Sequence, residues 1–253
     1  MKDKKKYELV WQYYASGSVV FVILAVLAAK LMSTASYQIT AGYITKNPLL
    51  SISSTYFVPA NKVLWDIQFR WTLVILMALS IIVPLVYVYL IKNNYKKIDL
   101  HKYRFIDWTI TGTIILLLIA IMSGASDIMT LVLIAGLSLI SYYLFWTIIN
   151  NQALQKSIST VIFKLGVLSS ILPWILILFY VIGTLVYGGI RSPWYIYVIY
   201  LVGLLNTAVI IYAYKWHKIH DSKPKITNET YPILINQAVK VLFVLVLIIG
   251  LKR

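Results

Sequence analysis

The sequence is poor in several residue types, and each shortage excludes a class of protein. It has no cysteine, which excludes disulfides and thiolate metal sites. Its three histidines lie in polar loop sequence, which argues against any metal site built from buried histidines. Only 12% of the 253 residues are charged, about half the share found in a soluble globular domain.

Long apolar stretches are what the sequence has in abundance. Hydrophobic residues make up 60% of the chain, and the mean hydropathy is +0.82. The apolar residues form runs of about 20, the length of a helix that crosses the hydrocarbon core of a bilayer. The sequence therefore predicts an all-α membrane protein, a bundle of seven transmembrane helices in a single domain over residues 1–253. The predicted helices cover 13–32, 71–91, 105–122, 128–149, 161–187, 194–214 and 231–251.

The segment between the first two predicted helices, residues 33–70, is longer than the other connections. It contains the pieces Tyr43-Ile-Thr45 and Ser54-Thr-Tyr-Phe-Val58, separated by Asn47-Pro48. Residues that favour strands on either side of turn residues are typical of a β-hairpin. We predict a small hairpin here that lies on the membrane surface. Further along, Gly124-Ala-Ser-Asp127 predicts a tight turn in which Ser126 or Asp127 caps the next helix.

The formal net charge of +15 has two possible explanations, nucleic-acid binding and the positive-inside bias of membrane proteins. The basic residues flank apolar runs and form no patch with interleaved aromatics, so we expect no nucleic-acid partner. Fifteen Lys and Arg residues fall on the side of the N-terminus and seven on the other side. This bias predicts a cytoplasmic N-terminus, an extracellular C-terminus and an extracellular hairpin.

Lys240 is the clearest candidate for a functional residue. It lies about ten residues from either end of the last predicted helix, too deep for its amine to reach water easily. A neutral buried lysine is a good nucleophile toward an aldehyde, with which it forms a Schiff base. The alternative is a structural lysine that pairs with a carboxylate or lines a cavity, and position alone leaves both readings open.

Asp107 is the candidate partner, because it is the one acidic residue that lies inside a predicted helix and not at a cap or in a loop. It shares a helix face with Thr111, as Asn236 does with Lys240. The alternative is a carboxylate at the membrane interface that is balanced by Arg104. At 1.5 Å per residue, Asp107 lies about 12 Å beyond Asp99 and Lys240 about 22 Å beyond Lys225. The last helix must therefore start outside the bilayer if the two side chains meet.

These residues belong to a pattern that resembles the heliorhodopsins. Tyr103-Arg-Phe-Ile-Asp107-Trp-Thr109 is similar to the family's aromatic-Arg-aromatic-x-Glu-Tyr-Ser segment. The spacing of Glu229 and Lys240 resembles that of the family's last helix. Further matches are Gly124-Ala-Ser-Asp-Ile128 with Gly136 and Trp146, Leu172-Pro-Trp174 continuing to Tyr180-Val-Ile182, and Asn206. The resemblance covers residues 100–251, and before residue 100 it rests on topology, on Leu24-Ala-Val-Leu27 and on Ser80.

The resemblance implies a light sensor and not an enzyme. Lys240 would carry all-trans retinal as a protonated Schiff base, and Asp107 would be its counter-ion. It further implies a homodimer in the lipid bilayer, a slow photocycle and no ion pumping. The other residues that it places around the retinal are Ser80, Thr111, Asn236, Trp108, Trp174, Tyr180 and Asn206.

The sequence also departs from the family pattern. Asp107 stands where the family usually has Glu, and Asn236 where it usually has Ser. Two family histidines are replaced, by Val19 and Pro84, which predicts an altered proton-accepting cavity. Two rival functions stay open: a light-gated proton or ion channel, and a scaffold or transporter without retinal. The scarcity of buried carboxylates argues against a pump more strongly than against a channel.

Overall fold

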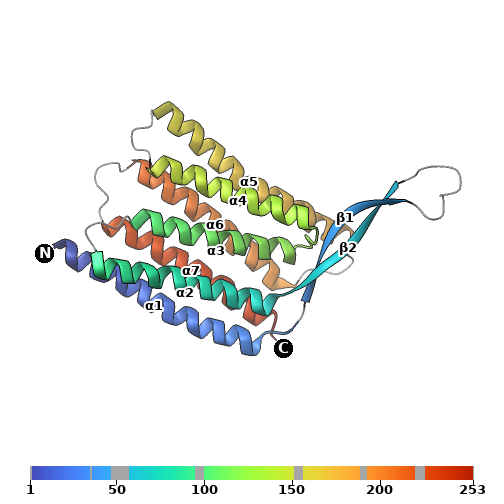
Figure 1. Cartoon of the computed structure of the whole chain (residues 1–253), viewed down its shortest axis with the longest axis horizontal. Helices are drawn as coiled ribbons and strands as arrows, with labels where there is room; N and C mark the ends of the chain where they lie inside the picture. Colours follow the sequence, from blue (N-terminus) through green and yellow to red (C-terminus); the bar gives the residue numbers. More distant parts are fainter. Residues whose placement is uncertain are drawn as a thin grey trace.

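Seven helices and one hairpin make up the described part of the chain (Figure 1). The computed structural model describes residues 2–34, 36–46, 57–94, 100–150, 156–188, 193–219 and 226–252. The helices are α1 (Lys2–Leu31), α2 (Phe69–Asn94), α3 (Leu100–Met122), α4 (Ile128–Asn150), α5 (Lys156–Tyr187), α6 (Trp194–Ile219) and α7 (Ile226–Gly250). The seven predicted helices are thereby confirmed, as is the hairpin between the first two.

The helices are longer than predicted, mostly at one end of the bundle. α1 begins at Lys2 instead of residue 13, and α7 begins at Ile226 instead of residue 231. His101 and His217, which the sequence analysis placed in loops, belong to the polar ends of α3 and α6. The prediction counted only apolar residues, whereas a helix continues into polar sequence wherever its backbone hydrogen bonds can continue. Asp99, from which the depth of Asp107 was estimated, lies outside the described residues.

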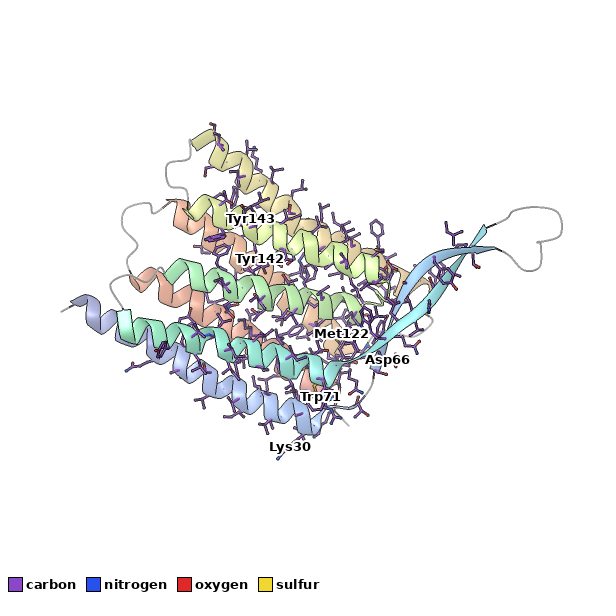
Figure 2. All side chains as sticks on the ribbon, viewed as in Figure 1. Lys30, Asp66, Trp71, Met122, Tyr142 and Tyr143 are labelled. Atoms are coloured by element: carbon purple, nitrogen blue, oxygen red, sulfur yellow. The ribbon has the colours of Figure 1, made fainter. Side chains whose placement is uncertain are left out.

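Six helices are long and apolar enough to cross a membrane, and α7 contributes a shorter apolar stretch, Leu234–Gly250. Many of their large apolar side chains face outward, including Ile175 and Leu178 on α5 and Val132 on α4. Figure 2 shows side chains extending outward from the helices on the visible side of the bundle. Such a surface is stable in lipid, since helices satisfy their own backbone hydrogen bonds there. The chain is an integral membrane protein.

The hairpin pairs β1 (Ser36–Lys46) with β2 (Phe57–Gln68) in antiparallel register and projects beyond the end of the bundle (Figure 1). The residues 47–56 at its tip, with Asn47-Pro48, lie outside the described part. Its base is attached to the α3–α4 turn, where the Thr40 amide donates to the Ser126 carbonyl oxygen at 2.9 Å. Gly124 forms this turn with a φ of 103°, which glycine adopts without strain. Asp127 caps α4, as predicted, because its Oδ2 accepts from the Thr130 amide at 3.0 Å.

α3 is the central helix of the bundle. Of its membrane-spanning residues 67% are buried, against 17–33% for the other five helices that are long enough to span. It contacts α2, α4, α5, α6 and α7. A polar residue on α3 therefore has to find its partners inside the protein, because neither water nor headgroups reach it. Asp107 is such a residue.

Candidate functional site

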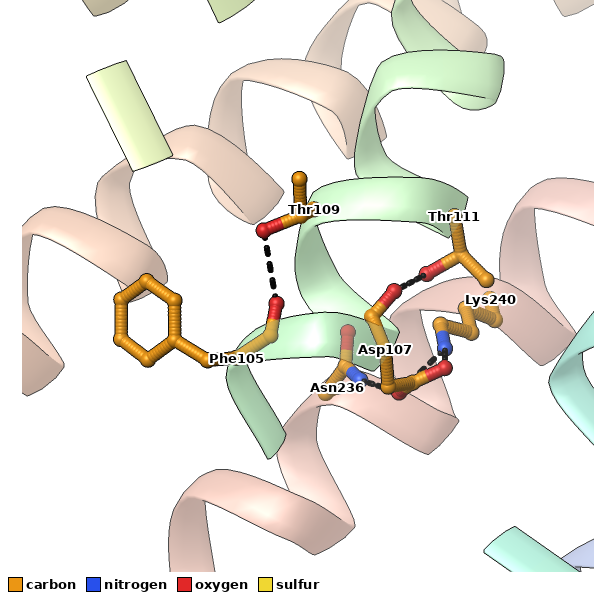
Figure 3. Close-up of polar contacts among 6 residues, drawn as sticks. All are labelled: Phe105, Asp107, Thr109, Thr111, Asn236 and Lys240. Carbon is orange, nitrogen blue, oxygen red and sulfur yellow. Dashed lines mark hydrogen bonds and ion pairs between the residues drawn. The ribbon is translucent and has the colours of Figure 1, made fainter. Parts of the chain in front are cut away.

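A buried ion pair joins α3 to α7. The Nζ atom of Lys240 lies 2.7 Å from both carboxylate oxygens of Asp107 (Figure 3). The two residues are only 1% and 6% exposed. Two charges so far from water are held in place by each other, since either one alone would be costly.

Asn236 completes the shell of the carboxylate. It lies one helical turn before Lys240 on α7, so both side chains face α3. Its Nδ2 donates to Asp107 Oδ2 at 2.9 Å, and the carboxylate thus accepts three hydrogen bonds, all from α7. α7 begins at Ile226, five residues before its predicted start, and Lys240 lies at the depth of Asp107. The sequence analysis required such an early start if the two side chains were to meet. The side chain of Arg104, the alternative partner of Asp107, lies outside the described part.

Thr111 lies close to the ion pair, but its hydroxyl hydrogen-bonds to the helix backbone and not to the two charged side chains. Its hydroxyl donates to the backbone carbonyl oxygen of Asp107 at 2.6 Å, and Thr109 likewise donates to that of Phe105 at 2.7 Å (Figure 3). A threonine in a helix commonly bonds back to the fourth preceding residue. The hydroxyl of Thr111 is therefore used by its own helix, while its side chain still lies beside the pair.

An interior cavity of about 30 Å³ lies between α3, α4, α5 and α6, and neither Asp107 nor Lys240 lines it. Its walls combine branched aliphatic side chains of α3 with hydroxyl and amide groups of the other three helices. Asn206, which is 6% exposed, is one of these. The lining residues are Gly112, Ile115, Leu116, Ile119, Ser138, Ser141, Tyr142, Phe145, Ser170, Pro173, Gly203, Asn206, Thr207, Ile210 and Ile211. The cavity borders α3 directly beyond Thr111, one to four turns from the carboxylate.

The two predicted tryptophans have different packing partners. Trp108 is 1% exposed and packs in a cluster with Phe105 and Tyr142. Trp174 donates from Nε1 to Thr207 Oγ1 at 3.1 Å. Its ring also lies against Gly203, where an added Cβ would be 2.7 Å from Cη2. Each indole is thus fixed by its surroundings.

Two predicted site residues remain, Ser80 in the bundle interior and Tyr180 far from the ion pair. Ser80 on α2 is fully buried, and within the described part of the chain its hydroxyl has no hydrogen-bond partner. Tyr180 lies away from the ion pair, near the base of the hairpin. It donates to Thr130 at 3.3 Å and lines a groove with Ser123 and Gly124.

The two positions with replaced histidines differ in their surroundings. Pro84 is buried on α2, but Val19 is 61% exposed and faces outward, while its neighbour Ser18 is buried. The structure therefore does not place Val19 in an inner cavity, and the expected change of the cavity wall at that position is wrong. A shift of one residue turns a helical side chain by about 100°, which alignment by resemblance does not detect.

The predicted site residues do not include Tyr142 or its neighbours Ser138 and Gly112, which line the cavity. Tyr142 and Tyr143 are adjacent on a helix that is apolar on every side, so no periodicity indicates which of them faces inward. A polar residue four positions away, Ser138, is the one signal that could have favoured Tyr142.

Comparison with known proteins agrees with this arrangement. A family model described as Heliorhodopsin matches residues 10–243. This range contains all nine predicted site residues, from Ser80 to Lys240. No individual curated protein gives a significant match.

Proposed function

The chain belongs to the heliorhodopsin family, and on this premise we propose that it senses light through all-trans retinal bound to Lys240. Membership makes it a retinal-binding, rhodopsin-like membrane protein; the residues of attachment and the use of the light signal are our proposal. The observation that carries the proposal is the buried pair of Lys240 and Asp107, 2.7 Å apart. It places the amine that would form the Schiff base against the carboxylate that a protonated Schiff base needs.

The residues present fit retinal. Lys240 has its amine inside the bundle, and a Schiff-base nitrogen would keep one proton to donate to Asp107. Aliphatic side chains of α3 line the cavity between α3 and α6 and would contact a polyene, and the cavity of about 30 Å³ would have to widen to hold it. Gly203 lets α6 pack closely against α3 and α5 at the cavity, since an added Cβ would overlap Ile119 and the ring of Trp174. By the family resemblance, Trp108 and Trp174 would also contact the polyene.

Bound retinal would supply light absorption and isomerisation. The chain's own residues would stabilise the positive charge at the Schiff-base nitrogen of Lys240. Asp107 holds the positive charge at the nitrogen of Lys240. Asn236 orients the carboxylate by its bond to Oδ2. Asp107 has one methylene less than the Glu that the family usually has. Its reach from α3 is shorter, so the approach of α7 must be close, and the bond from Asn236 helps to hold the two helices at that separation.

A sensor fits the described residues better than an efficient pump. Among the side chains that the structure describes, Asp107 is the only buried carboxylate, so no file of acidic groups leads through the bundle. We propose a slow photocycle without pumping, in a single membrane domain that forms homodimers. The excess of basic residues on its side puts the N-terminus in the cytoplasm. A light-gated channel is the second candidate, because passive conduction needs fewer fixed carboxylates.

The test is the visible spectrum of the purified protein after addition of all-trans retinal. We expect a visible absorption band for the wild type and none for Lys240→Ala. Lys164→Ala is the matched control, since Lys164 also lies in a long apolar helix but is exposed. A wild type without a visible band, or a Lys240→Ala protein that keeps it, contradicts the proposal. Voltage clamp under light separates the light sensor from the light-gated channel. A sustained passive photocurrent would reject the sensor without conduction and favour the channel.

A further inference from the structure

Trp174 on α5 connects two helices whose backbones stay apart. α5 and α6 border the same cavity, but their backbones come close at few points of their described length. The indole of Trp174 crosses from α5 to α6, where its Nε1 donates to Thr207 Oγ1 at 3.1 Å. Trp174 is therefore one of the groups that set how α5 and α6 lie beside the cavity.

The hydroxyl of Thr207 is well suited to hold an indole. It donates its own proton to the carbonyl oxygen of Gly203, one turn earlier on α6, at 3.2 Å. An indole N–H can only donate, whereas a hydroxyl oxygen can accept one hydrogen bond while it donates another. The two bonds therefore have compatible directions, and the hydroxyl is oriented on α6 by its own helix.

Gly203 gives the indole a second contact on α6. A Cβ added to this buried glycine would lie 2.7 Å from Cη2 and 3.2 Å from Cζ2 of Trp174. The edge of the indole ring thus rests on the backbone of α6, at a position where a side chain would displace it. The nitrogen and the ring edge are held at positions one turn apart on α6, and these two contacts together fix the rotation of the indole.

Both contacts of the indole belong to the wall of the cavity. Gly203 and Thr207 line it, as does Pro173, the residue before Trp174. Proline has no backbone N–H, so α5 lacks one internal hydrogen bond at this point. The helix backbone alone therefore holds the direction of Trp174 less firmly than in an unbroken helix. An indole released from Thr207 would have the cavity as empty space beside it.

We propose that Thr207 is a positioning residue for Trp174, and that its hydroxyl keeps the indole out of the cavity and leaves the cavity free for a polyene. The inference rests on the proposed function and extends it to α5 and α6. The cavity of about 30 Å³ has to widen before a polyene fits, so a side chain that turned into it would oppose binding. Thr207 acts through Trp174 and needs no contact with retinal.

The first experiment tests the hydrogen bond and needs no retinal. Ultraviolet resonance Raman spectra report whether an indole N–H is hydrogen-bonded, and the difference between the wild type and Trp174→Phe isolates the signal of Trp174. We expect a bonded indole in the wild type and in Thr207→Ser, which keeps the hydroxyl, and an unbonded one in Thr207→Val. An unbonded Trp174 in the wild type, or an unchanged signal in Thr207→Val, overturns the assigned contact.

The second experiment measures how fast the visible band appears after addition of all-trans retinal. We expect Thr207→Val to form pigment several-fold more slowly than the wild type, and Thr207→Ser to form it at nearly the wild-type rate. Thr147→Val is the matched control, because Thr147 is exposed and its hydroxyl also donates to its own helix, to the carbonyl oxygen of Tyr143 at 2.9 Å. Its rate should equal that of the wild type.

The background of Trp174→Phe shows whether Thr207 acts through the indole. In that background Thr207→Val should slow pigment formation no further, since the group that it positions is gone. A wild-type rate in Thr207→Val, or an equal slowing in both backgrounds, overturns the positioning role and leaves the proposed function intact. A wild type that forms no pigment at all would instead reject the proposed function.

Discussion

Asn236 and Lys240, one turn apart on α7, both donate hydrogen bonds to Oδ2 of Asp107, at 2.9 and 2.7 Å. A single carboxylate oxygen therefore connects the charge of the pair to a neutral amide. Because both donors belong to α7, any movement of α7 relative to α3 changes both bonds together. Under the proposed function, this pair is where absorption of light would first move α7 relative to α3.

Removal of the carboxylate should have the largest effect on the site. Asp107→Ala leaves Lys240 buried without its anion, and loss of one partner of a buried pair costs about 3–5 kcal/mol. We expect a lower thermal midpoint of the retinal-free protein and a pigment shifted to longer wavelength or lost. Asp107→Glu should keep both pigment and stability closer to the wild type. An Asp107→Ala protein with wild-type stability and colour would show that the pair has no such role.

Asn236 should affect colour more than stability. Asn236→Ala removes one neutral donor, and the counter-ion then attracts the Lys240 nitrogen more strongly. We expect a band at shorter wavelength, measured on purified pigment, with Ile235→Ala as the exposed control on the same helix. A shift in the opposite direction would mean that Asn236 does not stabilise the negative charge.

The cap of α4 offers a prediction away from the site. Asp127→Ala should cost about 1 kcal/mol, because the Thr130 amide loses its acceptor. Asp127→Asn should retain most of the stability, since the amide oxygen can accept the same bond. Thermal unfolding measures both changes, and the visible band should stay unchanged. Equal stability of Asp127→Ala and the wild type would contradict the capping role.

Most of the fold could be predicted from the sequence, because hydrophobic length and turn chemistry are local properties. The seven helices, the hairpin and the cap at Asp127 follow from such patterns. The pairing of Lys240 with Asp107 could also be predicted, because polar residues in apolar helices have few possible partners. Other features depend on how each helix is rotated about its axis. These are the outward orientation of Val19, the hydrogen bond of Thr111 to its own helix backbone, and which of Tyr142 and Tyr143 faces inward. Packing decides that rotation, and helices that are apolar on every side contain little sign of it.

The absence of cysteine allows a direct test of the predicted orientation. Asn61→Cys places a thiol on the exposed face of β2, and Ser157→Cys places one near the exposed start of α5. A membrane-impermeant maleimide should label Asn61→Cys on intact cells and Ser157→Cys only after permeabilisation. The reverse result would put the N-terminus outside.

The most direct test of the central claim locates the attached retinal. The protein is incubated with all-trans retinal, the Schiff base is reduced with borohydride, and the digested chain is analysed by mass spectrometry. We predict a retinyl mass on the peptide that contains Lys240 and on no other lysine peptide. A retinyl group on a different lysine, or an unmodified Lys240 peptide from a coloured sample, would contradict the account.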